Sequence, residues 1–179
     1  MAKTNPNIVQ LGNPTLRQPA ERIQTVQSPD LQALIDELLQ TMAQAGGVGI
    51  AAPQVGILKQ LVIIASRPTP RYPHAPEMLP TPMLNPQLVE HSDEIEKGWE
   101  GCLSVPGIRG LVPRYRSVTV DYLDRDGQPQ RQILHDFVAR IFQHEYDHLQ
   151  GVVFIDRVES THELMSEQEY QRQVMGSIS

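Results

Sequence analysis

The chain has 179 residues, of which 40% are hydrophobic and 20% are charged, an ordinary composition for one globular domain over residues 1–179. The formal net charge of −6 argues against nucleic-acid binding through a broad basic face, and no apolar run approaches the roughly 18 residues of a membrane span. The start lacks a secretory signal and the only cysteine, Cys102, has no partner for a disulfide, so we expect a cytoplasmic protein with no membrane or direct nucleic-acid partner.

The first predicted element is a helix that begins at Ser28. Ser28 can cap it, Pro29 suits the first helical position, and Asp30 interacts favourably with the positive end of the helix dipole. Gly46 and Gly47 then end the helix. Its apolar residues recur at helical spacing, which predicts one buried face: Leu31, Leu34, Ile35, Leu38, Leu39 and Met42.

Strands dominate the middle of the chain. An apolar strand is expected at 61–65, and seven prolines between 67 and 86 predict a surface loop over about 67–86. From 84 to 123 the pattern favours several short strands broken by glycine and proline. The pair Asp126-Gly127 is typical of a hairpin turn into a strand at 130–134.

A second helix is predicted to begin at Asp136 and to end at Gly151. We expect a short strand at 152–155 and a polar tail from about 159 that holds at most a weak helix. The sum predicts a single α+β domain in which mixed or antiparallel strands pack around a central metal-binding helix. The core-facing stripe of that helix carries both aromatic or aliphatic residues and histidines: Phe137, Ile141, His144 and His148.

The segment 144–148 has the pattern His-Glu-x-x-His. Histidines four apart on a helix lie one turn above each other, so His144 and His148 can reach one metal ion. Glu145 is rotated off that face by about 100°, beside the open coordination position, where it can accept and return a proton. The alternative is two hydrogen-bonded core histidines with no metal. The full pattern within a core-facing helix favours a metal site.

Catalytic sites of this kind usually need a third protein ligand. One protease class has its third ligand, a histidine, at the position of Phe154 in this chain. Phenylalanine cannot bind a metal, so that class is disfavoured. Another class places a glutamate near Glu163, and a zincin-type endopeptidase using Glu163 therefore stays open. The better candidate is Cys102, because a thiolate is a strong ligand for zinc or ferrous iron, although a lone cysteine is commonly a small buried hydrophobe. A structural metal site would need four protein ligands, and three are evident.

Three motifs in order, GVGIAAPQ at 47–54, EGCLS at 100–104 and QHEYDHLQG at 143–151, resemble the peptide deformylase family. The stretch 11–17 is also similar to the family's N-terminal segment, so the resemblance runs from about 8 to 157. It implies removal of the N-formyl group from formyl-methionine of nascent polypeptides, releasing formate, as one step of co-translational N-terminal processing.

The resemblance implies roles for individual residues. Glu145 would be the general base and then the acid that protonates the departing amine. The Gln54 amide and the backbone N–H of Leu103 would stabilise the oxyanion. One ion per chain, Fe²⁺ by resemblance with Zn²⁺ or another divalent metal as alternatives, would be held by Cys102, His144 and His148.

Substrate contacts are also implied. Gly47, Val48 and Gly49 would pair with the bound peptide as an added strand, and Ile50 would help to line the pocket for the methionine side chain. Arg140 stands where some relatives carry an aliphatic residue, which alters the expected pocket lining.

Two further expectations concern charged residues. Glu100 and Arg114 are expected by resemblance to form a buried structural pair. Transient proximity to the ribosome is compatible with the expected substrate. The tail, however, is acidic, because Glu163, Glu167 and Glu169 outnumber Arg172, which predicts weak or no ribosome docking through residues 159–179.

Overall fold

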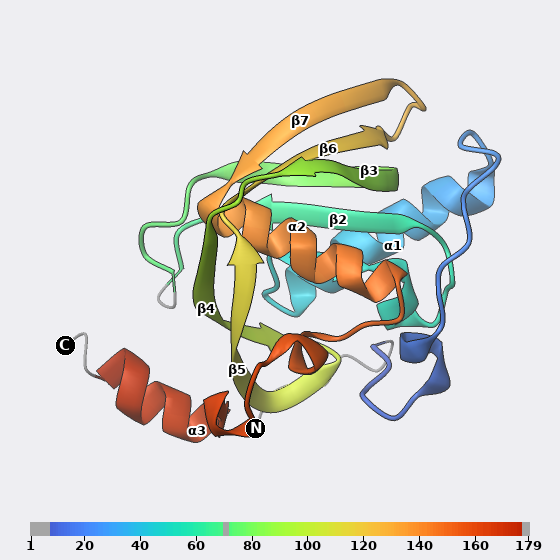
Figure 1. The fold of residues 1–179 in the computed structure, drawn as a ribbon. Coiled ribbons are helices and arrows are strands. Elements are labelled where there is room, and N and C mark those ends of the chain that lie inside the picture. Colours follow the sequence, from blue (N-terminus) through green and yellow to red (C-terminus); the bar gives the residue numbers. More distant parts are fainter. Residues whose placement is uncertain (1–7, 70–71, 177–179) are drawn as a thin grey trace.

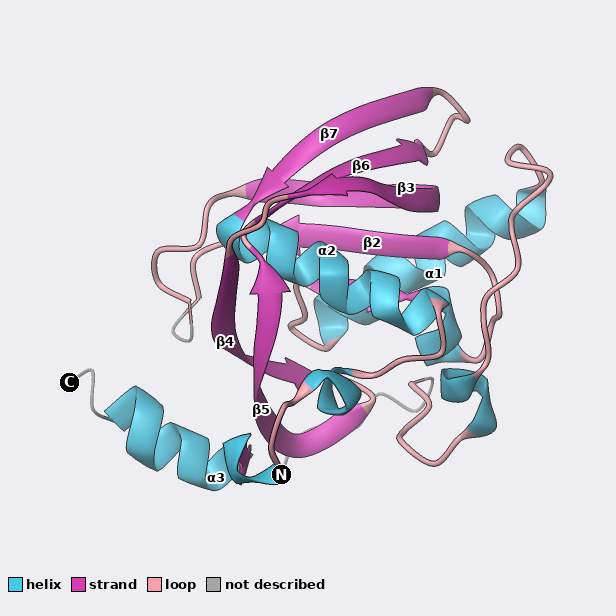
Figure 2. Cartoon of the chain, viewed as in Figure 1, coloured by secondary structure: helices cyan, strands magenta, loops and turns pink. Residues whose placement is uncertain are grey.

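The computed structural model describes residues 8–69 and 72–176. Within them two antiparallel sheets and one central helix form a single α+β domain (Figure 1, Figure 2). The larger sheet has the strand order β1 (Gly49–Ala51), β2 (Leu61–Ser66), β3 (Met78–His91), β6 (Ser117–Leu123) and β7 (Pro129–His135). The smaller sheet has the order β4 (Ile95–Cys102), β5 (Val105–Tyr115) and β8 (Leu164–Ser166).

Two helices cover opposite faces of the larger sheet. Helix α1 (Pro29–Gln44) lies behind β2 in Figure 1, and α2 (Asp136–Leu149) crosses in front of it. The period-two alternation of β2 explains this arrangement. Val62 and Ile64 pack in the core cluster that contains α2, whereas Leu61 and Ile63 pack in the cluster that contains α1. The strand is therefore buried on both faces and reads as a continuous apolar run.

Both predicted helices are present. Ser28 caps α1 by accepting a hydrogen bond from the Leu31 amide at 3.3 Å, and α2 begins at Asp136 and ends before Gly151, whose φ is +72°. None of the described helices is long and apolar enough to span a membrane.

The predicted proline-rich loop is too long. Strand β3 begins at Met78, so residues 78–86 belong to the sheet rather than to a surface loop. Pairing with β6 starts only at Leu84, and the half of β3 that contains Pro80 and Pro82 has β2 as its single neighbour among the described strands. A proline nitrogen that faces the open side loses no ladder hydrogen bond, which is why proline is tolerated there. The strands between 84 and 123 are also longer than expected.

The strand predicted at 152–155 is wrong. Residues Phe154–Arg157 form a 3-10 turn in which Asp156 accepts a hydrogen bond from the Val153 amide at 2.8 Å. Val153 and Phe154 are fully buried, so the apolar run reports burial and not extended structure. The tail contains, besides the expected weak helix α3 (Glu167–Tyr170), a strand that we did not predict, β8.

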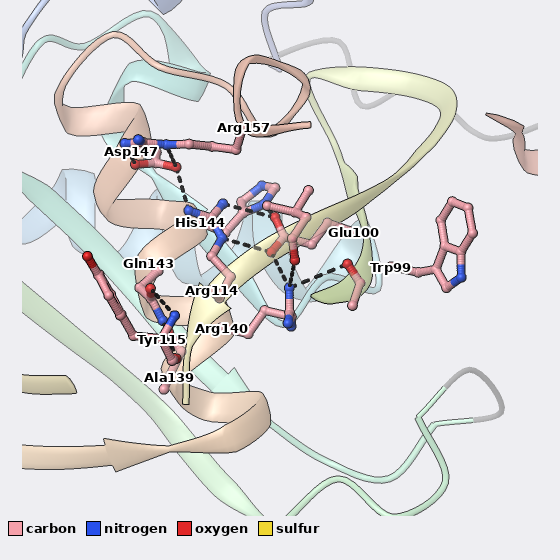
Figure 3. A network of polar contacts seen from close by, with 12 residues as sticks. Trp99, Glu100, Arg114, Tyr115, Ala139, Arg140, Gln143, His144, Asp147 and Arg157 are labelled. Atoms are coloured by element: carbon pink, nitrogen blue, oxygen red, sulfur yellow. Dashed lines mark hydrogen bonds and ion pairs between the residues drawn. The ribbon is translucent and has the colours of Figure 1, made fainter. Parts of the chain in front are cut away.

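A buried ion-pair network joins the smaller sheet to α2 (Figure 3). Arg114 of β5 donates to both carboxylate oxygens of Glu100 on β4, at 2.9 and 3.0 Å, and to Asp147 of α2 at 2.6 Å. The three side chains are only 4–6% exposed. Burial by itself would raise the pKa of the Glu100 carboxyl, but Arg114 and a hydrogen bond from His144 hold it well below its usual range. The expected Glu100–Arg114 pair is therefore confirmed.

We predict that Arg114→Met lowers the free energy of unfolding by about 3 kcal/mol, because Glu100 and Asp147 lose their shared buried cation, although they keep Arg140 and Arg157, respectively, as arginine partners. Urea denaturation measures the change. Arg131→Met is the matched control, because Arg131 makes a bidentate pair with Asp121 on the exposed side of the sheet and should cost far less. Equal losses in the two variants would contradict the structural role given to Arg114.

Candidate active site

Three side chains that could hold a metal ion converge where the end of β4 meets α2. The Sγ atom of Cys102 and the imidazole nitrogens of His144 and His148 all lie within 4.8 Å of one another. Sγ is 3.3 Å from Nε2 of His148, across 46 positions of sequence. The helix supplies the two histidines from adjacent turns, and the packing of β4 against α2 brings the cysteine to them. It is the only such group of three found among the described residues.

The donor set fits a divalent transition metal. One thiolate and two imidazoles suit zinc or ferrous iron. Nδ1 of His144 donates to Glu100 Oε2 at 2.8 Å, which leaves Nε2 as the nitrogen for a metal, in the arrangement that metal-binding histidines commonly show. Burial by itself would lower the pKa of both imidazoles. At His144 the hydrogen bonds with Cys102 and Glu100 outweigh burial and raise the pKa, whereas at His148 burial prevails and holds the pKa well below its usual range.

Glu145 is buried beside this cluster. Burial raises the pKa of its carboxyl to about 7, and its Oε2 has no hydrogen-bond partner within the described residues. Gly49 on β1 makes the room for it, because a Cβ at that position would lie 2.3 Å from Oε1 of Glu145. The carboxylate is thus held at the cluster by a close approach that only glycine permits.

Gln54 connects the first motif to the cysteine. Its Oε1 accepts a hydrogen bond from the Ala51 amide at 2.9 Å, which fixes the orientation of the side-chain amide. Its Nε2 then points to Ser104 Oγ at 3.2 Å and to Cys102 Sγ at 3.4 Å. Taken alone, Gln54 would not be recognised as a functional residue, because a single glutamine in a turn carries no signal. Only its place in the motif at 47–54 singles it out.

A cavity of about 520 Å³ opens onto these residues, a size typical of small-ligand sites. Gly47, Val48 and Gly49 line it, and so do Cys102, Leu103, His144 and Glu145. Sequence reasoning missed much of the remaining wall, which comes from residues scattered over the chain: Thr69, Tyr72, Trp99, Arg109, Gln171 and Met175.

Ile50 does not line this cavity, contrary to our expectation that it helps to form the methionine pocket. Successive side chains of a strand point to opposite faces. Gly49 faces Glu145, so Ile50 faces the other way, where it is fully buried in the core cluster under α1.

Arg140 lies in the cavity wall, but its charge is already satisfied. The guanidinium donates to Glu100 Oε1 at 3.0 Å and to the backbone carbonyls of Val112 and Glu96 at 2.8 and 2.7 Å. Gly98 provides the space, because a Cβ there would be 2.7 Å from Cζ of Arg140. Arg140 thus braces β4 and β5 rather than offering a free cation to a ligand.

Glu163, the alternative ligand of a zincin-type protease, lies elsewhere. Its Oε1 is 2.5 Å from Lys97 Nζ, and it is not part of the metal-binding group. The geometry therefore favours Cys102 as the third ligand.

Comparison with known proteins agrees with this geometry. The profile of the family described as polypeptide deformylase matches residues 6–163. Peptide deformylase 2 of a Nostoc species is 62% identical over 93% of both chains, and peptide deformylase 1 of Bordetella pertussis is 47% identical over 84% of this chain and 86% of its own. Among solved structures, the Met-Ala-Ser-bound class I type b peptide deformylase of Acinetobacter baumannii has a TM-score of 0.84 and 44% identity, covering 88% of this chain and 100% of its own.

A second solved structure, a peptide deformylase of Synechococcus elongatus in complex with actinonin, has a TM-score of 0.79 and 42% identity over 91% of this chain and 84% of its own. Matches of this extent show the family. The chain belongs to the peptide deformylases, metal-dependent hydrolases that remove the N-formyl group from nascent polypeptides.

Proposed function

We propose that the deformylation site consists of a metal ion held by Cys102, His144 and His148, with Glu145, Gln54 and Leu103 acting on the formyl group. The observation that carries this proposal is the convergence of the three ligand atoms within 4.8 Å beside the buried carboxylate of Glu145. When bound, the ion supplies Lewis-acid chemistry, lowering the pKa of a water molecule and polarising a carbonyl. We propose Fe²⁺ as the working metal, with Zn²⁺ as the alternative that the same ligands accept.

The protein's own groups would manage the proton and the developing charge. Glu145 accepts a proton from the attacking water and passes it to the nitrogen of methionine as the carbon–nitrogen bond of the formamide breaks. Formate and a free amino terminus result. The carbonyl oxygen gains negative charge on attack, and the Gln54 Nε2 amide and the Leu103 backbone N–H are the donors proposed for it. Gln54 is suited to this role because Ala51 already fixes which end of its amide faces Cys102.

We further propose that the peptide binds along Gly47, Val48 and Gly49. Strand β1 is at the end of the larger sheet, with β2 as its one neighbour in the described sheet order. The Val48 carbonyl already accepts from the Ala65 amide at 2.7 Å. An added strand on the outer side of this segment would use backbone hydrogen bonds for affinity and a side-chain pocket for specificity.

The proposed substrates are formyl-methionyl peptides in the cytoplasm, with transient proximity to the ribosome that delivers them. We propose no direct nucleic-acid contact by the tail, because Glu167 and Glu169 keep that segment acidic.

Metal content distinguishes the proposed ligand set from the protease alternative. Cys102→Ala should lose most of its bound metal, because one of three ligands is removed, whereas Glu163→Ala should retain a full equivalent. Elemental analysis of protein purified without air measures both, and also identifies the metal. Full retention by Cys102→Ala together with loss in Glu163→Ala would reverse the assignment.

Glu145→Gln tests the proton-transfer role. The substitution preserves size but removes the basic oxygen, so we expect kcat to fall at least about 10²-fold with metal content unchanged. Hydrolysis of a formyl-methionyl dipeptide, followed by formate release, gives the rate. Near-normal turnover by fully metallated Glu145→Gln would assign the base to another group.

Gly49→Ala should displace the same carboxylate without changing its chemistry, since the new methyl group would overlap Oε1. We expect a clear loss of kcat with the metal retained. Gly47→Ala provides a milder comparison, because the nearest atom to its Cβ would be a flexible Leu103 methyl group at 3.3 Å, with the next atoms at ordinary contact distances of 3.5 and 3.6 Å. A larger loss of kcat in Gly47→Ala than in Gly49→Ala would contradict the steric argument.

A further inference from the structure

The segment after residue 163 lies outside the region that matches the family profile. It comprises β8, α3 and a single π-helical turn over Gln171–Met175, seen as the red helix at the lower left of Figure 1. We call residues 164–175 the C-terminal arm. Its polar sequence predicted only a weak helix.

The C-terminal arm is docked on the smaller sheet. Strand β8 pairs with β5, with Leu164 opposite Gly110 and Ser166 opposite Ile108. Gly110 permits close packing here, because a Cβ there would lie 2.9 Å from side-chain atoms of Phe154 and Val158 and 3.1 Å from a methyl group of Leu164. Ser166 then caps α3 by accepting a hydrogen bond from the Glu169 amide at 3.2 Å.

Side chains hold α3 against the wall of the cavity. Arg109 of β5 forms an ion pair with Glu167, and its Cζ lies 5.5 Å from the ring centroid of Tyr170. Tyr170 is only 3% exposed and packs edge-on against Trp99, with ring centroids 5.6 Å apart. Cation–π and aromatic pairs of this kind each contribute favourably when they are desolvated.

Arg109 also connects the C-terminal arm to the metal-binding motif. Its guanidinium lies against Gly101, the residue before Cys102, and a Cβ at Gly101 would be 1.8 Å from Nη1. The arm is therefore attached to the same strand end that presents the proposed cysteine ligand.

The far end of the C-terminal arm reaches the cavity itself. Gln171 and Met175 line the same cavity as Cys102 and Glu145. Met175 and Trp99 are both half-buried there, so each leaves apolar surface facing the space. A peptide whose formyl group is at the metal-binding end and whose chain continues through this cavity would place a later side chain beside them.

Building on the deformylase site described above, we propose that the C-terminal arm is a specificity element of this chain. Met175, together with Trp99, contacts the side chain of the third residue of the formyl-peptide and favours an apolar one there. The arm thereby adds a contact from outside the segment that matches the family profile.

The test uses three substrates with amidated C-termini: formyl-Met-Ala, formyl-Met-Ala-Leu and formyl-Met-Ala-Ser. The unmodified protein should show a higher kcat/KM for the leucine peptide than for the serine peptide. Met175→Ala should reduce that leucine-to-serine ratio to about one fifth, since an apolar contact of this size discriminates by roughly tenfold or more when complete. Met165→Ala is the matched control: the same substitution in the same arm, at a residue that does not line the cavity. It should leave the ratio unchanged.

Isothermal calorimetry with the products Met-Ala-Leu amide and Met-Ala-Ser amide gives a measurement independent of turnover. If the unmodified protein binds the leucine product more tightly and Met175→Ala abolishes that preference, the specificity role is supported, whether or not the formyl-peptides are hydrolysed. Absence of hydrolysis would instead contradict the proposed function. Equal ratios in Met175→Ala and the unmodified protein, or an improved ratio in Met175→Ala, would overturn the role of the C-terminal arm.

Discussion

The geometry of the site depends on the buried guanidinium of Arg114. It links Glu100 at the end of β4 to Asp147 on α2, and Glu100 in turn accepts a hydrogen bond from His144. Two buried carboxylates in one region would be costly without a shared cation. Because the same carboxylate compensates Arg114 and orients a proposed metal ligand, the interaction that joins the smaller sheet to the helix also sets the direction of one imidazole.

Glycines determine where the charged groups of the site can lie. Gly49 makes room for Glu145, Gly98 for Arg140 and Gly101 for Arg109, and in each case a Cβ would fall within 2.8 Å of the side chain. Two of these three charged side chains, Arg109 and Arg140, are already paired with a carboxylate or hydrogen-bonded to backbone carbonyls. Glu145 differs, because one of its oxygens has no partner within the described part of the chain, which suits the proton-transfer role proposed for it.

The sequence predicted the elements whose signals are local. The cap at Ser28, the apolar period of α1 and the stripe of α2 all describe contacts within a few residues, and both helices are confirmed. Predictions failed where a residue pattern reflected the surroundings of a segment and not its backbone conformation. The apolar run at 152–155 is a buried turn, and the prolines of 78–86 lie in a strand with one open side. Ile50 failed for a related reason: its motif placed the backbone correctly, but strand alternation turns the side chain into the core.

By itself the sequence determined that His144 and His148 share a helix face with Glu145 beside it, because the α-helical period imposes that arrangement on any helix with this pattern. The approach of Cys102 to His148 was decided by tertiary structure, since no local period relates residues 46 positions apart. The same holds for the C-terminal arm. Its polar sequence predicted a tail with a weak helix and no particular contact, whereas pairing with β5 and the burial of Tyr170 dock it at the cavity. Such docking depends on a matching edge and pocket elsewhere in the fold, which composition cannot report.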